Sequence, residues 1–137
     1  MRIALDAMGG DNAPVETIKG AVAALSEIEK LQLVLVGKKE VIEAELSKYK
    51  YSKERIEIVD TREVIEMTDD PVTAVKTKKD SSMNKTLELA KEGIVDASVS
   101  AGNTGALITA SQLKLKRIRG VLRPAIATMF PNKKGHM

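Results

Sequence analysis

Short apolar runs alternate with segments of helical spacing along most of this 137-residue chain, and that alternation limits the fold more than any other feature. Apolar and β-branched runs predict strands at residues 2–6, 31–36, 55–59, 97–100 and 125–129. Apolar residues at spacings of three and four predict helices at 14–29, 40–49 and 81–93, and another that begins at residue 103 or 104. Strands that alternate with helices through short connections favour an α/β protein with a mostly parallel sheet covered on both faces.

Residues 60–80 are less regular. Val64 and Ile65 fit a short strand or a helix equally well, and Asp69-Asp70-Pro71 predicts a turn or the start of a helix. This stretch is therefore the part of the chain whose structure is least determined by its pattern.

Composition narrows the functional classes. The chain has no cysteine, which excludes disulfides, thiolate nucleophiles and cysteine metal sites and favours a reducing cytoplasm. Its one histidine, His136, makes a histidine metal cluster unexpected, so we expect no metal. With three aromatic side chains and no tryptophan, binding of single-stranded nucleic acid by base stacking is not expected. We also expect neither a signal peptide nor a membrane span.

The charges are unevenly distributed along the chain. Residues 97–137 carry seven basic and no acidic side chains: Lys114, Lys116, Arg117, Arg119, Arg123, Lys133 and Lys134. Such a basic end can attract an acidic protein, an anionic lipid or nucleic acid. A solvated surface, balanced by acidic residues elsewhere, explains the same pattern equally well.

Two glycine-rich turns each connect a predicted strand to a predicted helix. They are Gly9-Gly10-Asp11-Asn12 and Gly102-Asn103-Thr104-Gly105. The unpaired N–H groups and the positive dipole end of a helix face outward at such a turn, which suits an anion such as phosphate. An ordinary capped strand-to-helix turn explains either segment as well.

The polar residues of these turns have two possible uses each. Asn103 and Thr104 can donate hydrogen bonds to anion oxygens or cap the helix. Asp11 can orient a basic side chain, accept a proton or cap a helix. In the run 76–82, lysines and serines can contact phosphate, although a solvated basic helix end is the simpler interpretation. The dinucleotide, P-loop and G-x-S-x-G motifs are absent.

Four segments together are more specific than any one of them. These are residues 6–11, residues 70–83, residues 100–107 and Arg123-Pro124-Ala125, in that order. With them, essentially the whole chain resembles the bacterial PlsX family, the acyl-[acyl carrier protein]:phosphate acyltransferases of phospholipid synthesis.

That resemblance implies a three-layer α/β/α fold like that of phosphate acetyltransferases and isopropylmalate dehydrogenases. It implies that residues 1–137 are the N-terminal part of a longer acyltransferase whose remainder is absent here. It further implies a homodimer without a cofactor in the cytoplasm, held at the inner face of the cell membrane through an element outside this chain.

The implied reaction is attack of inorganic phosphate on the thioester of an acyl group carried by acyl carrier protein, which gives acyl phosphate. The candidate catalytic residues are Asn103 and Asp11. The candidate phosphate- or substrate-binding residues are Gly9, Gly10, Asn12, Lys79, Ser81, Gly102, Thr104 and Gly105. Docking of the acidic carrier protein is expected on Lys114, Lys116, Arg117 and Arg119.

Two other functions stay open. The chain alone can be a non-catalytic module that binds phosphate or the carrier protein, or a phosphotransacetylase-like enzyme that uses coenzyme A.

Overall fold

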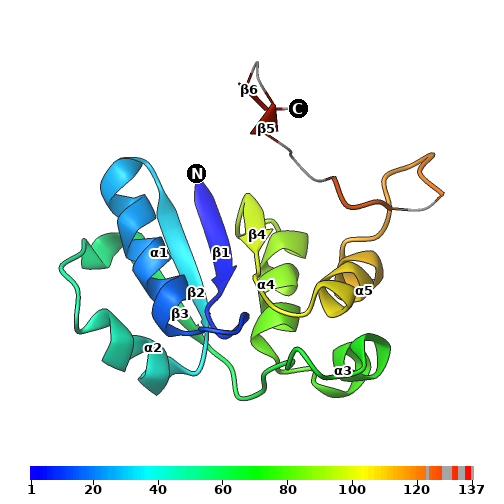
Figure 1. Ribbon diagram of the computed structural model, residues 1–137, viewed down its shortest axis with the longest axis horizontal. Helices are drawn as coiled ribbons and strands as arrows, with labels where there is room; N and C mark the ends of the chain where they lie inside the picture. Colours follow the sequence, from blue (N-terminus) through cyan, green and yellow to red (C-terminus); the bar gives the residue numbers. More distant parts are fainter. Residues whose placement is uncertain (123, 128–130, 133–134, 137) are drawn as a thin grey trace.

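Four parallel strands form the central sheet in the computed structural model, which describes residues 1–122, 124–127, 131–132 and 135–136. The strands lie in the order β3-β2-β1-β4 (Figure 1). Their bounds are β1 Arg2–Asp6, β2 Gln32–Gly37, β3 Ile56–Asp60 and β4 Ala97–Val99. Strand β1 pairs in parallel with β2 and with β4, so that Leu5 lies opposite Leu35 on one side and Val99 on the other. The expected mostly parallel sheet is confirmed.

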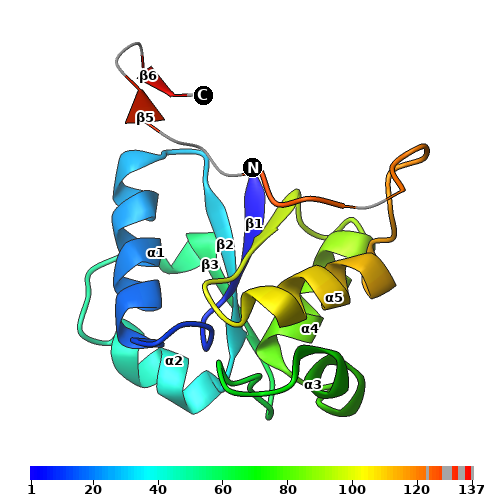
Figure 2. The same ribbon diagram turned by 45° about the vertical axis from the view of Figure 1, so that its right-hand side comes forward.

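Helices cover both faces of this sheet, so the fold has three layers (Figures 1 and 2). On one face lie α1 and α2, and on the other lies α4. Helix α5 packs against α4, and α3 packs against α5. The bounds are α1 Val15–Glu27, α2 Lys39–Leu46, α3 Pro71–Thr77, α4 Ser82–Lys91 and α5 Thr104–Lys114, with a short 3₁₀ turn η1 at Lys53–Arg55. The expected α/β/α architecture is therefore confirmed.

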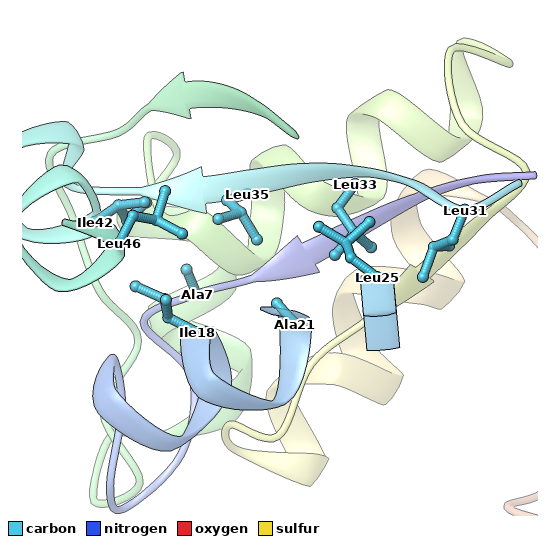
Figure 3. Packing of buried hydrophobic residues seen from close by; sticks show 9 residues of the cluster. All are labelled: Ala7, Ile18, Ala21, Leu25, Leu31, Leu33, Leu35, Ile42 and Leu46. Atoms are coloured by element: carbon cyan, nitrogen blue, oxygen red, sulfur yellow. The ribbon is translucent and has the colours of Figure 1, made fainter. Parts of the chain in front are cut away.

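Strand β2 is buried on both faces, which is why its sequence is continuously apolar. Leu33 and Leu35 point to α1 and α2, where Figure 3 shows them among the other buried residues of that cluster. Val34 and Val36 point the opposite way, to α4. Complete burial of each such side chain stabilises the fold by about 1.5–3 kcal/mol, so the middle of the sheet is its best-secured part.

Helix α1 shows how the apolar spacing is used. Ile18, Ala21 and Leu25 lie at intervals of three and four and face the sheet (Figure 3). Val15, at the start of the same stripe, is 44% exposed. The helix ends two residues earlier than predicted because Ile28 is extended and its amide closes the last turn on Ala24.

The less regular stretch contains one short helix. The Asp70 carboxylate accepts a 2.8 Å hydrogen bond from the Thr73 amide and caps α3, and Pro71 occupies its first turn. The predicted turn or helix start at these residues is confirmed. A second apolar cluster then holds α3, α4 and α5 together: Ile65, Ala74, Val75, Met83, Leu87, Ala106 and Ala110.

The predicted strand at 125–129 is wrong for residues 125–127, and residues 128 and 129 lie outside the described part of the chain. Ile126 is 61% exposed, so this apolar run does not pack against the sheet. The next paired residues, β5 Pro131–Asn132 and β6 Gly135–His136, form a separate antiparallel pair. None of the helices in the described ranges is both long and apolar enough to cross a bilayer.

Candidate functional site

The two glycine-rich turns meet at the carboxyl edge of the sheet. After β1 the chain crosses to β2 on one side, whereas β4 joins β1 from the other side. The turn at 7–14 follows β1 and the turn at 100–103 follows β4, so they lie next to each other (Figure 2). Ligands of open α/β sheets bind at such a change of direction, outside the carboxyl ends of the strands.

The glycines let the two backbones approach closely. A Cβ added at Gly102 would lie 3.3 Å from Gly9 Cα, and one at Gly10 would lie 3.4 Å from Ala101 Cβ. Gly10 also has a φ of +118°, which side chains rarely permit. The structure thus brings Gly9, Gly10 and Gly102 together, as three of the predicted site residues.

The buried carboxylate of Asp6 connects the two turns through hydrogen bonds. Asp6, the last residue of β1, is 1% exposed. Its Oδ1 accepts a hydrogen bond from the Met8 amide at 3.2 Å, and its Oδ2 accepts one from Ser100 Oγ at 2.7 Å. Ser100 Oγ in turn accepts the Gly102 amide at 3.2 Å. One network therefore spans both turns.

In the second turn, one backbone amide is hydrogen-bonded within this network and the next three amides are unpaired in the part of the chain that the structure describes. The Gly102 amide is used by Ser100 Oγ, whereas the amides of Asn103, Thr104 and Gly105 have no acceptor among the described residues. Unpaired amides are usual in the first turn of a helix, and here they lie at the positive end of α5. They are the groups of the site that suit an anion.

The Asn103 side chain is fully committed to the protein. It is 7% exposed, and its Oδ1 accepts the Ala106 amide at 3.0 Å as the cap of α5. Its Nδ2 donates to three backbone carbonyls of the 66–69 loop, at 3.2–3.3 Å: Glu66, Met67 and Asp69. Asn103 thus fastens that loop to α5, and a catalytic role of its side chain stays a prediction.

Gly105 and Thr104 differ in their surroundings. A Cβ at Gly105 would lie 2.9 Å from Pro71 Cγ, so glycine lets α3 pack against the start of α5. The Thr104 side chain is exposed.

An ion pair stiffens the 66–69 loop. Asp69 Oδ2 accepts hydrogen bonds from Lys78 Nζ at 2.5 Å and from the Glu66 amide at 2.8 Å. Lys78 first, and then the Glu66 amide, hold the pKa of Asp69 below its usual value. The Asp69 carboxylate is therefore charged at neutral pH and neutralises Lys78, which is not a free cation for a ligand.

Asp11 and Asn12 lie exposed at the rim of the site. They line one end of an apolar cleft of about 630 Å³ between α1 and the β1–β4 side of the sheet. Within the described residues their side chains make no hydrogen bond or ion pair. Both stay candidates, without contacts that assign them a role.

Lys79 and Ser81 occupy different environments. Ser81 is completely buried and caps α4 by accepting the Asn84 amide at 3.4 Å. Met83, in the first turn of that helix, packs beneath Gly102. Lys79 is exposed, and within the described residues no hydrogen bond joins its side chain to either glycine-rich turn.

The four predicted docking cations near the end of α5 also differ in their surroundings. Lys114 Nζ bonds Glu88 of α4 at 2.6 Å and helps to hold α5 in place. Lys116, Arg117 and Arg119 are exposed just after α5, so three of the four predicted docking cations are on the surface. Arg123, Lys133 and Lys134 lie outside the described residues.

Sequence reasoning did not select Asp6 and Ser100 as site residues. The available signal was a carboxylate at the end of an apolar strand, because a buried charge requires hydrogen-bond donors. Its partner could not be chosen from the sequence, since Ser100 is 94 positions away.

Comparison with known proteins gives one family and several relatives. A family model described as "Fatty acid synthesis protein" matches residues 1–137. A phosphate acyltransferase from Fusobacterium nucleatum is 66% identical over 134 residues, which are 98% of this chain and 40% of that protein. One from Dictyoglomus turgidum is 55% identical over 131 residues, 96% of this chain and 39% of that protein.

The chain therefore spans about 40% of the length of the curated relatives it matches. Among solved structures, a phosphotransacetylase from Streptococcus pyogenes matches with a TM-score of 0.62 and 18% identity. The match covers 90% of this chain and 40% of that one. At this identity the likeness shows the fold alone.

Proposed function

The chain belongs to the fatty acid synthesis protein family, as its resemblance to the PlsX family predicted, and from that membership we propose that it takes part in acyl transfer to inorganic phosphate. The relatives named phosphate acyltransferase support the acyl and phosphate parts of this reaction. Because the chain spans about 40% of their length, the proposal concerns its contribution to the site.

One observation carries the phosphate part of the proposal. The amides of Asn103, Thr104 and Gly105 have no acceptor within the described structure, at the positive end of α5 and beside the glycines of the first turn. Phosphate binds well to such amides because they need no side-chain rearrangement.

The chemistry requires position more than activation. A phosphate oxygen attacks the thioester carbonyl carbon, and the C–S bond then breaks to give acyl phosphate and the carrier thiol. The nucleophile is supplied by the substrate, so the chain has to hold a polyanion against an electron-poor carbonyl. The same amides can stabilise the negative charge that develops on the carbonyl oxygen.

Acyl carrier protein is the donor that we propose. The exposed cations Lys116, Arg117 and Arg119 follow α5, whose other end carries the free amides. An acidic carrier is attracted to such a segment by charge complementarity.

A binding role without catalysis is the second candidate. It is favoured because the site, as far as the structure describes it, offers unpaired amides for an anion, whereas the Asn103 side chain is used for capping and for loop contacts. The test measures incorporation of radiolabelled inorganic phosphate into an organic-soluble product. The reactions contain this chain or the Fusobacterium nucleatum relative, with palmitoyl-acyl carrier protein or palmitoyl-coenzyme A.

Label incorporated by this chain, more strongly with the carrier thioester, supports catalysis by the proposed reaction. Label with the relative alone, together with phosphate binding by this chain, supports the binding role. Preference for the coenzyme A thioester contradicts the carrier as donor. Absence of both label and phosphate binding overturns the proposal for this chain.

A further inference from the structure

The reaction proposed above leaves Asp6 without a chemical task, although it is a buried acid beside the site. We propose that Asp6 and Ser100 are a positioning pair, which directs the amides of residues 103–105 toward the bound phosphate. This inference rests on the proposed function, since it concerns the same anion site.

Ser100 is the residue through which the pair acts. A serine hydroxyl rotates freely unless its proton has a fixed acceptor. Here the proton is donated to Asp6 Oδ2 at 2.7 Å, which turns an oxygen lone pair to the Gly102 amide at 3.2 Å. The direction of the Gly102 peptide is thereby set from the carboxylate.

Asp6 is itself held without a cation. Its Oδ1 accepts the Met8 amide, and no ion pair of Asp6 occurs in the described residues. Gly9 covers it closely, because a Cβ at Gly9 would lie 2.5 Å from Oδ2. A carboxylate covered in this way does not contact phosphate, whose charge it would repel, and its effect passes through Ser100 instead.

The consequence appears one residue further along the chain. With the Gly102 amide engaged, the chain enters α5 with the next three amides unpaired. Without the Ser100 hydroxyl, the Gly102 amide becomes a further unpaired donor, and the glycine can rotate at little cost. Anion affinity then falls because the amides no longer point in one direction.

The test is a titration of this chain with inorganic phosphate, followed at the backbone amides by NMR. Ser100→Ala removes both hydrogen bonds, Ser100→Thr keeps the hydroxyl, and Ser26→Ala is the matched control. Ser26 is an exposed serine of α1 whose hydroxyl donates to the Ala23 carbonyl. Hydrogen exchange at Gly102 and the thermal midpoint are measured for each protein.

We expect phosphate to shift the amide resonances of residues 103–105 in the wild-type chain. Ser100→Ala should raise the dissociation constant by about tenfold, the loss typical of a site that depends on one charge-assisted hydrogen bond. It should also abolish protection of the Gly102 amide. Ser100→Thr should stay within about threefold of wild type, and Ser26→Ala should match wild type.

Wild-type phosphate affinity in a folded Ser100→Ala variant overturns the positioning role. Loss of affinity in Ser100→Thr as large as in Ser100→Ala also overturns it, because the hydroxyl would then not matter. If Ser100→Ala does not fold, Ser100→Cys, whose thiol is a weak donor and acceptor, is measured in its place, and unchanged affinity has the same meaning. If phosphate does not shift the amide resonances of residues 103–105 in the wild-type chain, the proposed function itself is overturned, and the inference with it.

Discussion

Gly9 lies directly over the Asp6–Ser100 pair, where a side chain has no room. A Cβ there would approach Asp6 Oδ2 to 2.5 Å and Ser100 Oγ to 2.9 Å. Neither of these atoms is the free end of a long side chain, so the crowding can be relieved only by moving one of the turns.

Gly9→Ala should therefore lower the free energy of unfolding by about 1–3 kcal/mol, as overpacking of a buried site does. Urea denaturation of the two proteins measures this change. Phosphate affinity should fall in the same variant, because the turns separate where the amides are positioned.

Gly20→Ala is the matched control, since Gly20 lies in the exposed face of α1 and a Cβ there meets no atom within 4 Å. It should raise the free energy of unfolding by about 0.5–1 kcal/mol because alanine is the better helix former. Equal effects of the two substitutions would contradict the crowding at Gly9.

At this scale the sequence identified the residue types but not their partners. Glycines between a strand and a helix predicted both turns, because that composition permits close backbone approach. The bond from Ser100 to Asp6 was beyond prediction, since it depends on β4 lying beside β1. Asn103 was recognised as a cap or an anion ligand, but its contacts with the 66–69 loop depend on tertiary packing.

The junction between α5 and the 66–69 loop depends mainly on one side chain. Asn103 caps the helix through Oδ1 and holds the loop through Nδ2, and Gly105 lets α3 approach the same helix end. The start of α5 is therefore positioned by a loop that lies more than thirty residues earlier in the chain.

Asn103→Ala should lower the free energy of unfolding by about 1–3 kcal/mol, because a cap is lost and three partly buried loop hydrogen bonds lose their donor. Asn103→Asp keeps the cap oxygen but not the Nδ2 donor, so its free energy of unfolding should lie between those of the wild-type chain and Asn103→Ala. Thermal and urea unfolding measure both variants.

Asn12→Ala provides the comparison, since Asn12 is exposed and its side chain makes no hydrogen bond to the described residues. It should change the free energy of unfolding by no more than about 0.5 kcal/mol. An Asn103→Ala variant as stable as Asn12→Ala would show that the loop is held by other contacts. Loss of activity in Asn103→Ala has to be corrected for this instability before it is attributed to catalysis.

Elements with strong periodicity were predictable within two or three residues at each end. The 3.6-residue spacing of α1 and the continuous apolar run of β2 are examples. The seven-residue α3 was visible only as a start, because its stability comes from the Asp70 cap and from packing on α5. The run at 125–127 has the composition of a strand but no neighbouring strand to pair with in the structure as described.

Across the described part of the molecule, the edge of the sheet formed by β4 is left unpaired. Strand β4 is an edge of the four-stranded sheet, Val99 is 48% exposed, and the apolar cleft lies between this edge and α1. Exposed apolar edges pair with other chains unless a charge opposes it.

Sedimentation should accordingly show that this chain self-associates as its concentration rises, in line with the homodimer that its family resemblance led us to expect. Val99→Lys should weaken the association by at least about tenfold, because a charge on an edge strand opposes pairing.

The control is Val41→Lys, which changes a 37% exposed valine of α2 away from β4. It should associate like the wild-type chain. A monomeric wild-type chain, or equal effects of the two lysines, would contradict a role of the β4 edge.

The layers were predictable at this scale, whereas the strand order was not. Alternating strands and helices require a parallel sheet with helices on both faces. Nothing in the spacing shows that β4 joins β1 rather than β3, and this choice places the two glycine-rich turns side by side. The sequence thus predicted two separate turns, and the strand order of the sheet brings them together in one site.

The Asp6–Ser100 bond closes 94 residues of chain. During synthesis on the ribosome, the first turn emerges early. It cannot bond Ser100 until β4 has been translated and has docked beside β1. Such a distant closure is slow compared with local helix formation. The anion pocket should thus mature last, and its appearance would mark the end of folding for these layers.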